Sequence, residues 1–333
     1  MARENPSHLP DSITIDELDQ QALQELNRRV DPLGVVSTYV TVDPADPEAA
    51  GIDIGNRYRE LHQRMSQSDR QSRSGVLAGL DRWRPEVERL TSPVASGRGR
   101  VLFAGLSDGW SLRLDSQMPM PNRVVLDDGP FIHPLLEMLD EGQAAGVALF
   151  SGESGRLLEW RLGRLRPLQE FQRQEAEAPH ERAGQIGGGP PGQFHTPIAE
   201  HREARDRDLA QRFLARIADA VAGEAAGRGW TRMVVSGGRR WTGVLADQLP
   251  EPLRGLVIEE HRVLAGLSHQ AVTDAVTDRL HEDHLATERR LVERIREAGL
   301  AGTAALGLSE VTAALNEGRV AHLVYDPEVR YSG

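Results

Sequence analysis

The sequence predicts a multi-domain α/β protein. Short apolar or β-branched runs alternate with longer segments whose apolar residues recur every three or four positions, the pattern of strands and amphipathic helices. With 333 residues and 39% hydrophobic content, the chain can form two or three cores. We predict an N-terminal α/β domain over residues 1–142, a central α/β domain over 143–267 with a protruding glycine-rich loop at 184–193, and a long helix with a short, partial C-terminal α/β unit over 268–333.

The N-terminal region begins with a helical pattern and continues with a strand whose sequence, GVVSTYVTV, is β-branched. Pro85 is expected to break or restart its helix, because a proline inside a helix removes a backbone hydrogen bond. An Asp-Pro turn at 43–47 closes the first strand. The expected helices are 14–30, 55–72, 75–91 and 131–139, and the expected strands are 34–42, 100–106, 109–115 and 122–126.

In the central region, the order of apolar segments predicts an antiparallel group of strands followed by alternating helices and strands. Its expected strands are 146–150, 156–162, 165–171, 232–235 and 256–264, and its expected helices are 197–222 and 240–248. A long helix over 268–298 follows. A helix at 308–316 and a strand at 319–325 cannot close a domain alone, so we expect this unit to lean on the long helix or to be truncated.

The glycine-rich loop has few side chains that could be buried, so we expect it to stand out from the body. Glycine tolerates positive φ and allows close backbone approach, whereas Pro190 and Pro191 fix φ locally. The helix after the loop has an apolar side formed by Leu209, Phe213, Leu214, Ile217 and Val221. Its other side carries arginines mixed with acidic residues: Arg202, Arg205, Arg207, Arg212 and Arg216.

Two further interpretations of the loop come from its glycine spacing. Gly187, Gly189 and Gly192 fit a dinucleotide-binding spacing, but the preceding segment is polar, whereas that motif needs a buried strand. A phosphate-binding P-loop is excluded because the chain has no lysine. A disordered surface insertion stays open.

The composition excludes several kinds of chemistry. The absence of cysteine removes disulfides and thiolate catalysis and suits a reducing compartment. A net charge of −11 argues against non-specific nucleic-acid coating, although arginine patches can still contact RNA phosphates. We see no signal peptide or membrane span, and we expect a cytoplasmic protein without a membrane, DNA or cofactor partner.

Other groups of polar residues give weaker signals. His281 and His284 are three apart, whereas the zincin pattern needs four, so a solvated helix face is favoured and no metal is expected. Glu259, Glu260 and His261 lie in a strand and cannot all point to one side. A set of arginines before the loop is equally consistent with phosphate contact and with paired surface charge: Arg156, Arg161, Arg164, Arg166 and Arg173.

The order of these elements resembles the archaeal and eukaryotic class-1 release factor family, and more narrowly its bacterial Vms1-like members. The likeness rests on the first strand, the strands around residues 100–115, the glycine-rich loop ending in glutamine, the long arginine-bearing helix, the strand RMVVSGG, and residues 307–325. In this family a Gly-Gly-Gln tip enters the peptidyl-transferase centre. There it helps water to hydrolyse the ester between peptide and tRNA.

The resemblance implies site residues. Gly192 and Gln193 match the tip, and Pro191 occupies the place of the other glycine. Gly184 and Gln185 form a second imperfect match, while Gly187, Gly188 and Gly189 supply mobility. Arg202, Arg205, Arg207 and Arg212 would contact RNA. The Asn-Ile-Lys-Ser codon-reading motif is absent.

We therefore expect a factor that releases peptides from stalled ribosomes or large subunits without reading stop codons. Its partners would be large-subunit rRNA and peptidyl-tRNA, with a translational GTPase as a further candidate. The alternative is a non-catalytic Pelota-like or hibernation-type factor in the tRNA site. A third hypothesis, an unrelated small-molecule enzyme with a disordered insertion, stays open.

Overall fold

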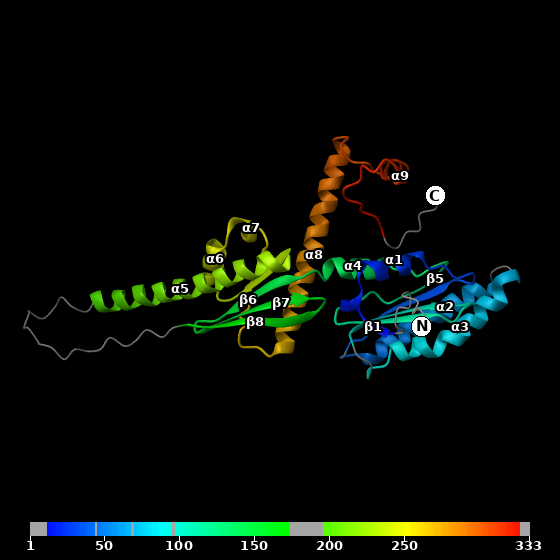
Figure 1. The fold of residues 1–333 in the computed structure, drawn as a ribbon, viewed down its shortest axis with the longest axis horizontal. Coiled ribbons are helices and arrows are strands. Elements are labelled where there is room, and N and C mark those ends of the chain that lie inside the picture. The colour runs from blue at the N-terminus through cyan, green and yellow to red at the C-terminus, as the bar shows by residue number, and fades with distance from the viewer. Residues whose placement is uncertain (1–11, 44, 68–69, 95–96, 174–195, 327–333) are drawn as a thin grey trace, which may run out of the picture. The chain divides into compact units, whose positions relative to one another are not determined.

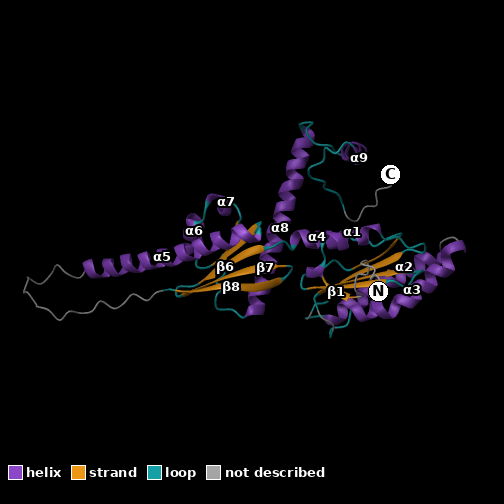
Figure 2. Cartoon of the chain, in the orientation of Figure 1, coloured by secondary structure: helices purple, strands orange, loops and turns teal. Residues whose placement is uncertain are grey.

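The computed structural model describes residues 12–43, 45–67, 70–94, 97–173 and 196–326. The chain divides into two units, residues 1–277 and 278–333. The first unit contains two five-stranded sheets, each with its own helices (Figures 1 and 2). The predicted α/β fold class is confirmed, whereas the domain limits at 142 and 267 stay predictions.

The first sheet has the strand order β1-β4-β3-β2-β5. Its strands are β1 (Ser12–Thr14), β2 (Val35–Thr41), β3 (Gly99–Gly105), β4 (Ser111–Ser116) and β5 (Arg123–Asp127). All pairs are antiparallel except β1 with β4. The β-branched strand β2 lies between β3 and β5, which explains why its side chains are almost all buried.

Four helices accompany this sheet. They are α1 (Gln20–Arg28), α2 (Pro47–Gln67), α3 (Arg70–Leu90) and α4 (His133–Glu141), and a 3-10 turn (Ile15–Glu17) precedes α1. Helices α2 and α3 pack on one face of the sheet, where Ile54 and Leu80 meet Val36 and Leu102.

Two predictions about these helices were wrong. Helix α3 continues through Pro85, because that residue lies on the exposed face while Val87 and Leu90 remain buried in the core. Helix α2 begins at Pro47 instead of residue 55. Proline is favoured in the first helical turn, and the Asp46 carboxylate accepts a hydrogen bond from the Ala49 N–H at 3.3 Å.

The second sheet has the strand order β10-β9-β6-β7-β8. Its strands are β6 (Ala145–Phe150), β7 (Ser154–Arg161), β8 (Arg164–Gln172), β9 (Arg232–Ser236) and β10 (Val257–Glu260). Strands β6, β7 and β8 are antiparallel, and β9 and β10 add to β6 in parallel. Leu162 and Gly163 join β7 to β8, and both have positive φ, as a tight hairpin turn requires.

The helices of this sheet are α5 (Thr196–Arg228), α6 (Arg239–Gln248), the short α7 (Glu251–Arg254) and the first part of α8 (His269–Leu300). Helix α5 extends six residues beyond the predicted end, because Ala225 continues its buried stripe. Strand β10 is shorter than predicted. After Glu260 the backbone N–H of Arg262 donates to the Glu260 carboxylate at 2.7 Å, in place of a bond to a neighbouring strand.

The second unit contains the rest of α8 and helix α9 (Leu308–Asn316), which has the predicted limits. The strand predicted at 319–325 is not formed. An extended segment becomes a strand only when another strand accepts and donates its backbone hydrogen bonds, and the described part of this unit offers none. Within the described ranges, no helix is both long and apolar enough to cross a bilayer.

Candidate functional site

Helix α5 is longer than the surface on which it packs. The described side chains of α5 begin at Glu203; those from Glu203 to Asp208 are all exposed, and the first buried one after them is Ala210. From there a buried stripe follows at helical spacing: Phe213, Leu214, Ile217, Ala218, Val221 and Ala225. Figure 1 shows the first turns of α5 extending past the ends of β7 and β8. We call residues 196–208 the overhang of α5.

Arg173, just after β8, joins three segments at the base of the overhang. Its backbone N–H donates to the Glu153 carbonyl at 2.7 Å. Its guanidinium donates to the carbonyls of Gly152 at 3.1 Å and Asp206 at 2.8 Å, and forms an ion pair with the Asp206 carboxylate. In the reverse direction, Arg216 of α5 donates to the Gln172 carbonyl at 2.7 Å.

The predicted loop residues lie outside the described part of the chain. These are Gly184, Gln185, Gly187, Gly188, Gly189, Gly192 and Gln193. Their roles stay predictions. The structure does describe both flanks, because β8 ends at Gln172 and α5 begins at Thr196, three residues after Gln193.

The predicted RNA-contacting arginines belong to α5. Arg205, Arg207 and Arg212 have exposed side chains, while Arg202 lies in the helix and its side chain is outside the described set. Arg212 is paired with Asp208 at 2.8 Å, and both side chains are exposed. Acidic residues are interspersed with the arginines, so the helix surface presents mixed charge rather than a uniform basic stripe.

The arginines of β7 and β8 have two interpretations on sequence grounds, phosphate contact and paired charge. Three of them have partners within the protein. Arg156 donates to the Ala265 carbonyl at 3.0 Å, Arg164 lies 3.4 Å from Asp16, and Arg173 holds α5. Arg161 and Arg166 are exposed. The paired-charge interpretation therefore gains support for Arg164 and Arg173, two of the five.

The weaker candidates do not form a site. Glu260 is buried and paired with Arg262 at 2.8 Å, whereas the exposed Glu259 faces His261 at 3.8 Å, so these neighbours diverge as expected for a strand. His284 on α8 lies 3.3 Å from Glu288, one turn further along the helix. Among the residues that the structure describes, no three potential metal ligands come together.

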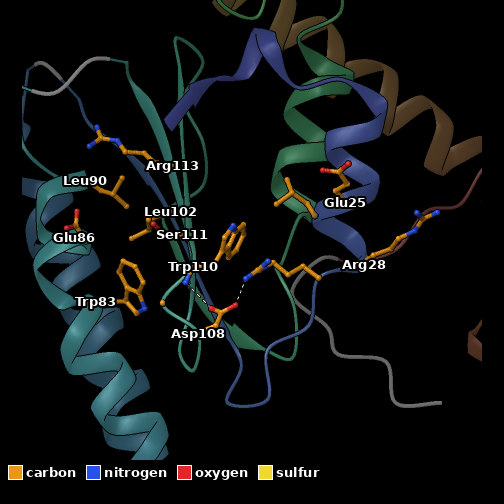
Figure 3. A pocket seen from close by; sticks show the side chains of 13 residues that line it. Glu25, Arg28, Trp83, Glu86, Leu90, Leu102, Asp108, Trp110, Ser111 and Arg113 are labelled. Atoms are coloured by element: carbon orange, nitrogen blue, oxygen red, sulfur yellow. Dashed lines mark hydrogen bonds and ion pairs between the residues drawn. The ribbon is translucent and has the colours of Figure 1, made fainter. Parts of the chain in front are cut away.

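The N-terminal region contains a cleft of about 900 Å³ that the sequence pattern does not reveal. It lies between α1, α3 and the start of β4 (Figure 3). The indole N–H of Trp83 donates to the Gly105 carbonyl at 2.9 Å, and the Arg29 guanidinium stacks 3.9 Å from the Trp110 ring. Arg29 also pairs with Asp108. The arginines and tryptophans that line the cleft are far apart in the sequence, so no local motif predicts that they come together.

The wall of this cleft carries both signs of charge. Glu25 and Glu86 line it together with Arg28 and Arg113 (Figure 3). Arg113 lies 3.4 Å from Asp115. Opposite charges so close to one another partly cancel, and the cleft offers neither anions nor cations a one-sided field. The overhang of α5 also carries mixed charge, and it is preferred as the candidate site because the sequence resemblance points to it.

Asp31 is an ionisable group whose pKa is shifted in the N-terminal region. Burial by itself would raise the pKa of this carboxyl group. Hydrogen bonds from the Ser107 hydroxyl and from the backbone N–H groups of Leu33, Ser107 and Asp108 outweigh burial and leave the pKa below its usual value. The Ser107 hydroxyl is 2.8 Å away, and the Leu33 N–H is also at 2.8 Å. This network fixes the turn before β2 and is structural.

Comparison with known proteins connects the candidate site to a family. Residues 130–285 match the family model described as bacterial archaeo-eukaryotic release factor family 10. The matched range includes β6 to β10, the whole of α5, and the glycine-rich loop. No curated protein matches the sequence.

Several solved structures are similar at low identity. An archaeal translation termination factor, aRF1, is 17% identical, with 92% of this chain and 84% of that chain covered and a TM-score of 0.31. Dom34 of S. cerevisiae is 9% identical, with coverages of 66% and 63% and a TM-score of 0.33. Pelota of Archaeoglobus fulgidus is 14% identical, with coverages of 66% and 60% and a TM-score of 0.28.

These TM-scores are too low for the structural likenesses to carry an argument about mechanism. The narrower resemblance to Vms1-like members stays a prediction. The family model covers the complete central sheet and α5, which are part of the sequence resemblance; the first strand, residues 100–115 and residues 307–325 lie outside it. Residues 130–285 of this chain therefore match the archaeo-eukaryotic type of release factor family.

Proposed function

We propose that this protein is a cytoplasmic, ribosome-associated rescue factor that hydrolyses the ester of peptidyl-tRNA on stalled ribosomes or large subunits. One observation carries the proposal. The overhang of α5 leads away from the central core. The glycine-rich loop lies just before it in the family-matched sequence, and Gly192 and Gln193 end that loop shortly before Thr196. A helix that outruns its packing surface is suited to deliver its attached loop to another molecule.

The proposed reaction is a hydrolysis. A water oxygen attacks the ester carbonyl carbon, the bond to the ribose oxygen of tRNA breaks, and a proton from water ends on that oxygen. A backbone N–H at the tip would stabilise the negative charge that develops on the carbonyl oxygen. The Gln193 side chain would restrict access to the ester so that water, rather than another nucleophile, reaches it.

The proposed partners are large-subunit rRNA and peptidyl-tRNA, with a translational GTPase as a further candidate. The exposed arginines of α5 support contact with phosphate groups, because guanidinium groups bind phosphate oxygens in pairs. The missing lysine supports release without stop-codon reading, since the Asn-Ile-Lys-Ser motif requires that residue.

A second candidate function is a non-catalytic factor that occupies the tRNA site. Pro191 favours it, because proline stands where the catalytic members have glycine. Proline fixes φ and has no backbone N–H to donate, so the tip would have less freedom and one hydrogen-bond donor fewer. Binding to the ribosome without release is the expected behaviour of this alternative.

The test is release of labelled peptide from purified ribosomal complexes that carry peptidyl-tRNA. We expect Gln193→Ala to abolish most release, while Gln185→Ala, a glutamine of the same loop, leaves release intact. If Gln185→Ala abolishes release and Gln193→Ala does not, Gln185 rather than Gln193 is the glutamine of the tip. Tight co-sedimentation without release by the wild type would support the non-catalytic alternative, and failure to co-sediment at low salt would contradict both functions.

Pro191→Gly separates the two candidate functions further. If the chain is catalytic with a restrained tip, restoring the glycine should increase the release rate. If release stays at background in Pro191→Gly while ribosome binding is retained, the catalytic proposal is wrong.

A further inference from the structure

The overhang of α5 needs support from outside its own sequence. It comprises residues 196–208, and the described side chains from Glu203 to Asp208 are all exposed. The overhang continues the packed part of the same helix and needs no new nucleus, but most helical stability in proteins comes from tertiary packing, which its exposed side chains do not supply. Among the described side chains of α5, burial begins at Ala210, so the side chains from Glu203 to Asp208 add no hydrophobic contacts to hold the turns before it.

Arg173 contacts the overhang directly. Its guanidinium reaches both the backbone carbonyl and the carboxylate of Asp206, and it also donates to Gly152 in the turn between β6 and β7. The Arg173 side chain is only 19% exposed, although Asp206 is 70% exposed. A planar guanidinium with five donors can serve these acceptors at the same time, whereas a lysine ammonium has no such fork.

A second contact ties the same two elements together further along α5. Arg216 donates to the Gln172 carbonyl and lies over the Phe213 ring at 5.7 Å. Asp206 and Arg216 are ten residues apart in the helix, which corresponds to about 15 Å along its axis. The contact of Arg216 lies beside the buried stripe of α5, whereas the contact of Asp206 lies before it, so Arg173 holds a part of the helix that the stripe does not cover.

We propose that Arg173 is a positioning residue: with Arg216, it clamps the end of β8 to α5 and so fixes where both ends of the loop leave the protein. We call the Arg173–Asp206 and Arg216–Gln172 contacts the clamp. The consequence for peptide release depends on the proposed function. The clamp itself does not, because it concerns contacts within this chain.

The clamp should affect the rate of reaction more than binding. Misplacement of a reacting group by about 1 Å can cost on the order of 100-fold in rate. We therefore expect Arg173→Ala to lower kcat by about 10- to 100-fold. We expect the ribosome concentration at half saturation to stay within about twofold, because the exposed arginines of α5 are unchanged.

The chain has no cysteine, so a pair of spin labels can be placed without a background. Gln169→Cys on β8 and Ala204→Cys on the overhang are both at exposed positions. We expect electron–electron resonance to give a narrow distance distribution for this pair. Arg173→Ala should broaden it, Arg173→Lys should broaden it partly, and Asp206→Asn, which keeps the backbone carbonyl, should have the smallest effect.

Arg212→Ala is the matched control, because Arg212 lies on the same helix and pairs with Asp208, one turn away on that helix. It should leave the distance distribution unchanged and should weaken ribosome binding. A thermal melt of each variant separates a loosened clamp from loss of folding, and Arg216→Gln tests the second tie if Arg173→Ala does not fold.

The outcomes separate the clamp from the proposed function. An unchanged distance distribution in Arg173→Ala, or in Arg216→Gln if the former does not fold, overturns the clamp whatever the release assay shows. A broadened distribution in a protein that never releases peptide supports the clamp and contradicts the release function. Broadening together with a lower kcat and unchanged half-saturation supports both.

Discussion

The helices of the two sheet regions differ in how much of their length is supported. In the N-terminal region, the buried residues of α3 run from Val76 to Leu90, its last residue. In the central region, α5 begins at Thr196, its side chains are described from Glu203 onward, and the first buried one among these is Ala210. The N-terminal helices complete a core, whereas α5 both completes a core and extends beyond it. A polar first third in an otherwise amphipathic helix therefore marks the segment available for contact with another molecule.

The largest expected effect comes from removing buried side chains of either helix. Leu80→Ala in α3 and Leu214→Ala in α5 should each lower the free energy of unfolding by about 2–5 kcal/mol, because both side chains are almost completely buried. Denaturant unfolding measures this. A loss below about 1 kcal/mol for Leu214→Ala would contradict the conclusion that α5 is packed in the core from Ala210 onward.

The Asp31 network should give the next effect. Asp31→Asn should cost about 2 kcal/mol near neutral pH, because it removes hydrogen bonds to an ionised carboxylate. The folded-state pKa of Asp31 is lowered, so its stabilisation is present above the unfolded-state value and is lost as the pH falls through the folded-state value.

The difference in stability between wild type and Asp31→Asn should therefore shrink in acid. Denaturant unfolding at a series of pH values checks this sign. A difference that grew as the pH fell below about 4 would show that the carboxylate is not held ionised by Ser107 and the backbone.

Glycine substitutions distinguish open from crowded positions. Gly223 lies within α5, and a Cβ added there would meet no other atom within 4 Å, so Gly223→Ala should stabilise the protein by about 0.5–1 kcal/mol. Gly146→Ala is the control, because a Cβ there would lie 2.5 Å from the Trp230 ring and should destabilise. Thermal melts measure both, and a stabilising Gly146→Ala would contradict the packing of β6 against Trp230.

The smallest effect on stability is expected in the overhang. Arg207→Ala should change the free energy of unfolding by less than about 0.5 kcal/mol, since the side chain is exposed. If the overhang contacts RNA, the same change should weaken ribosome binding and reduce its dependence on salt concentration. Unaltered binding at low and high salt would remove Arg207 from the proposed contact surface.

Local patterns in the sequence predicted most elements of both sheets. The apolar spacing of α5 and the β-branched run of β2 specify their structures because each pattern lies within one segment. The strand predicted at 319–325 shows the limit of this reasoning. Its valines and tyrosine favour a strand, but strand formation depends on a neighbour elsewhere in the chain.

The amino-acid sequence determined the α/β class, the position of the glycine-rich loop and the helix that follows it, because these depend on residue spacing and on glycine itself. Only the tertiary structure decided where the buried stripe of α5 begins and which residue contacts the overhang. Arg173 and Asp206 are 33 residues apart, and the Gly152 carbonyl is 21 residues before Arg173. Contacts over such separations leave no periodic signal, since the sheet and α5 bring the three segments together.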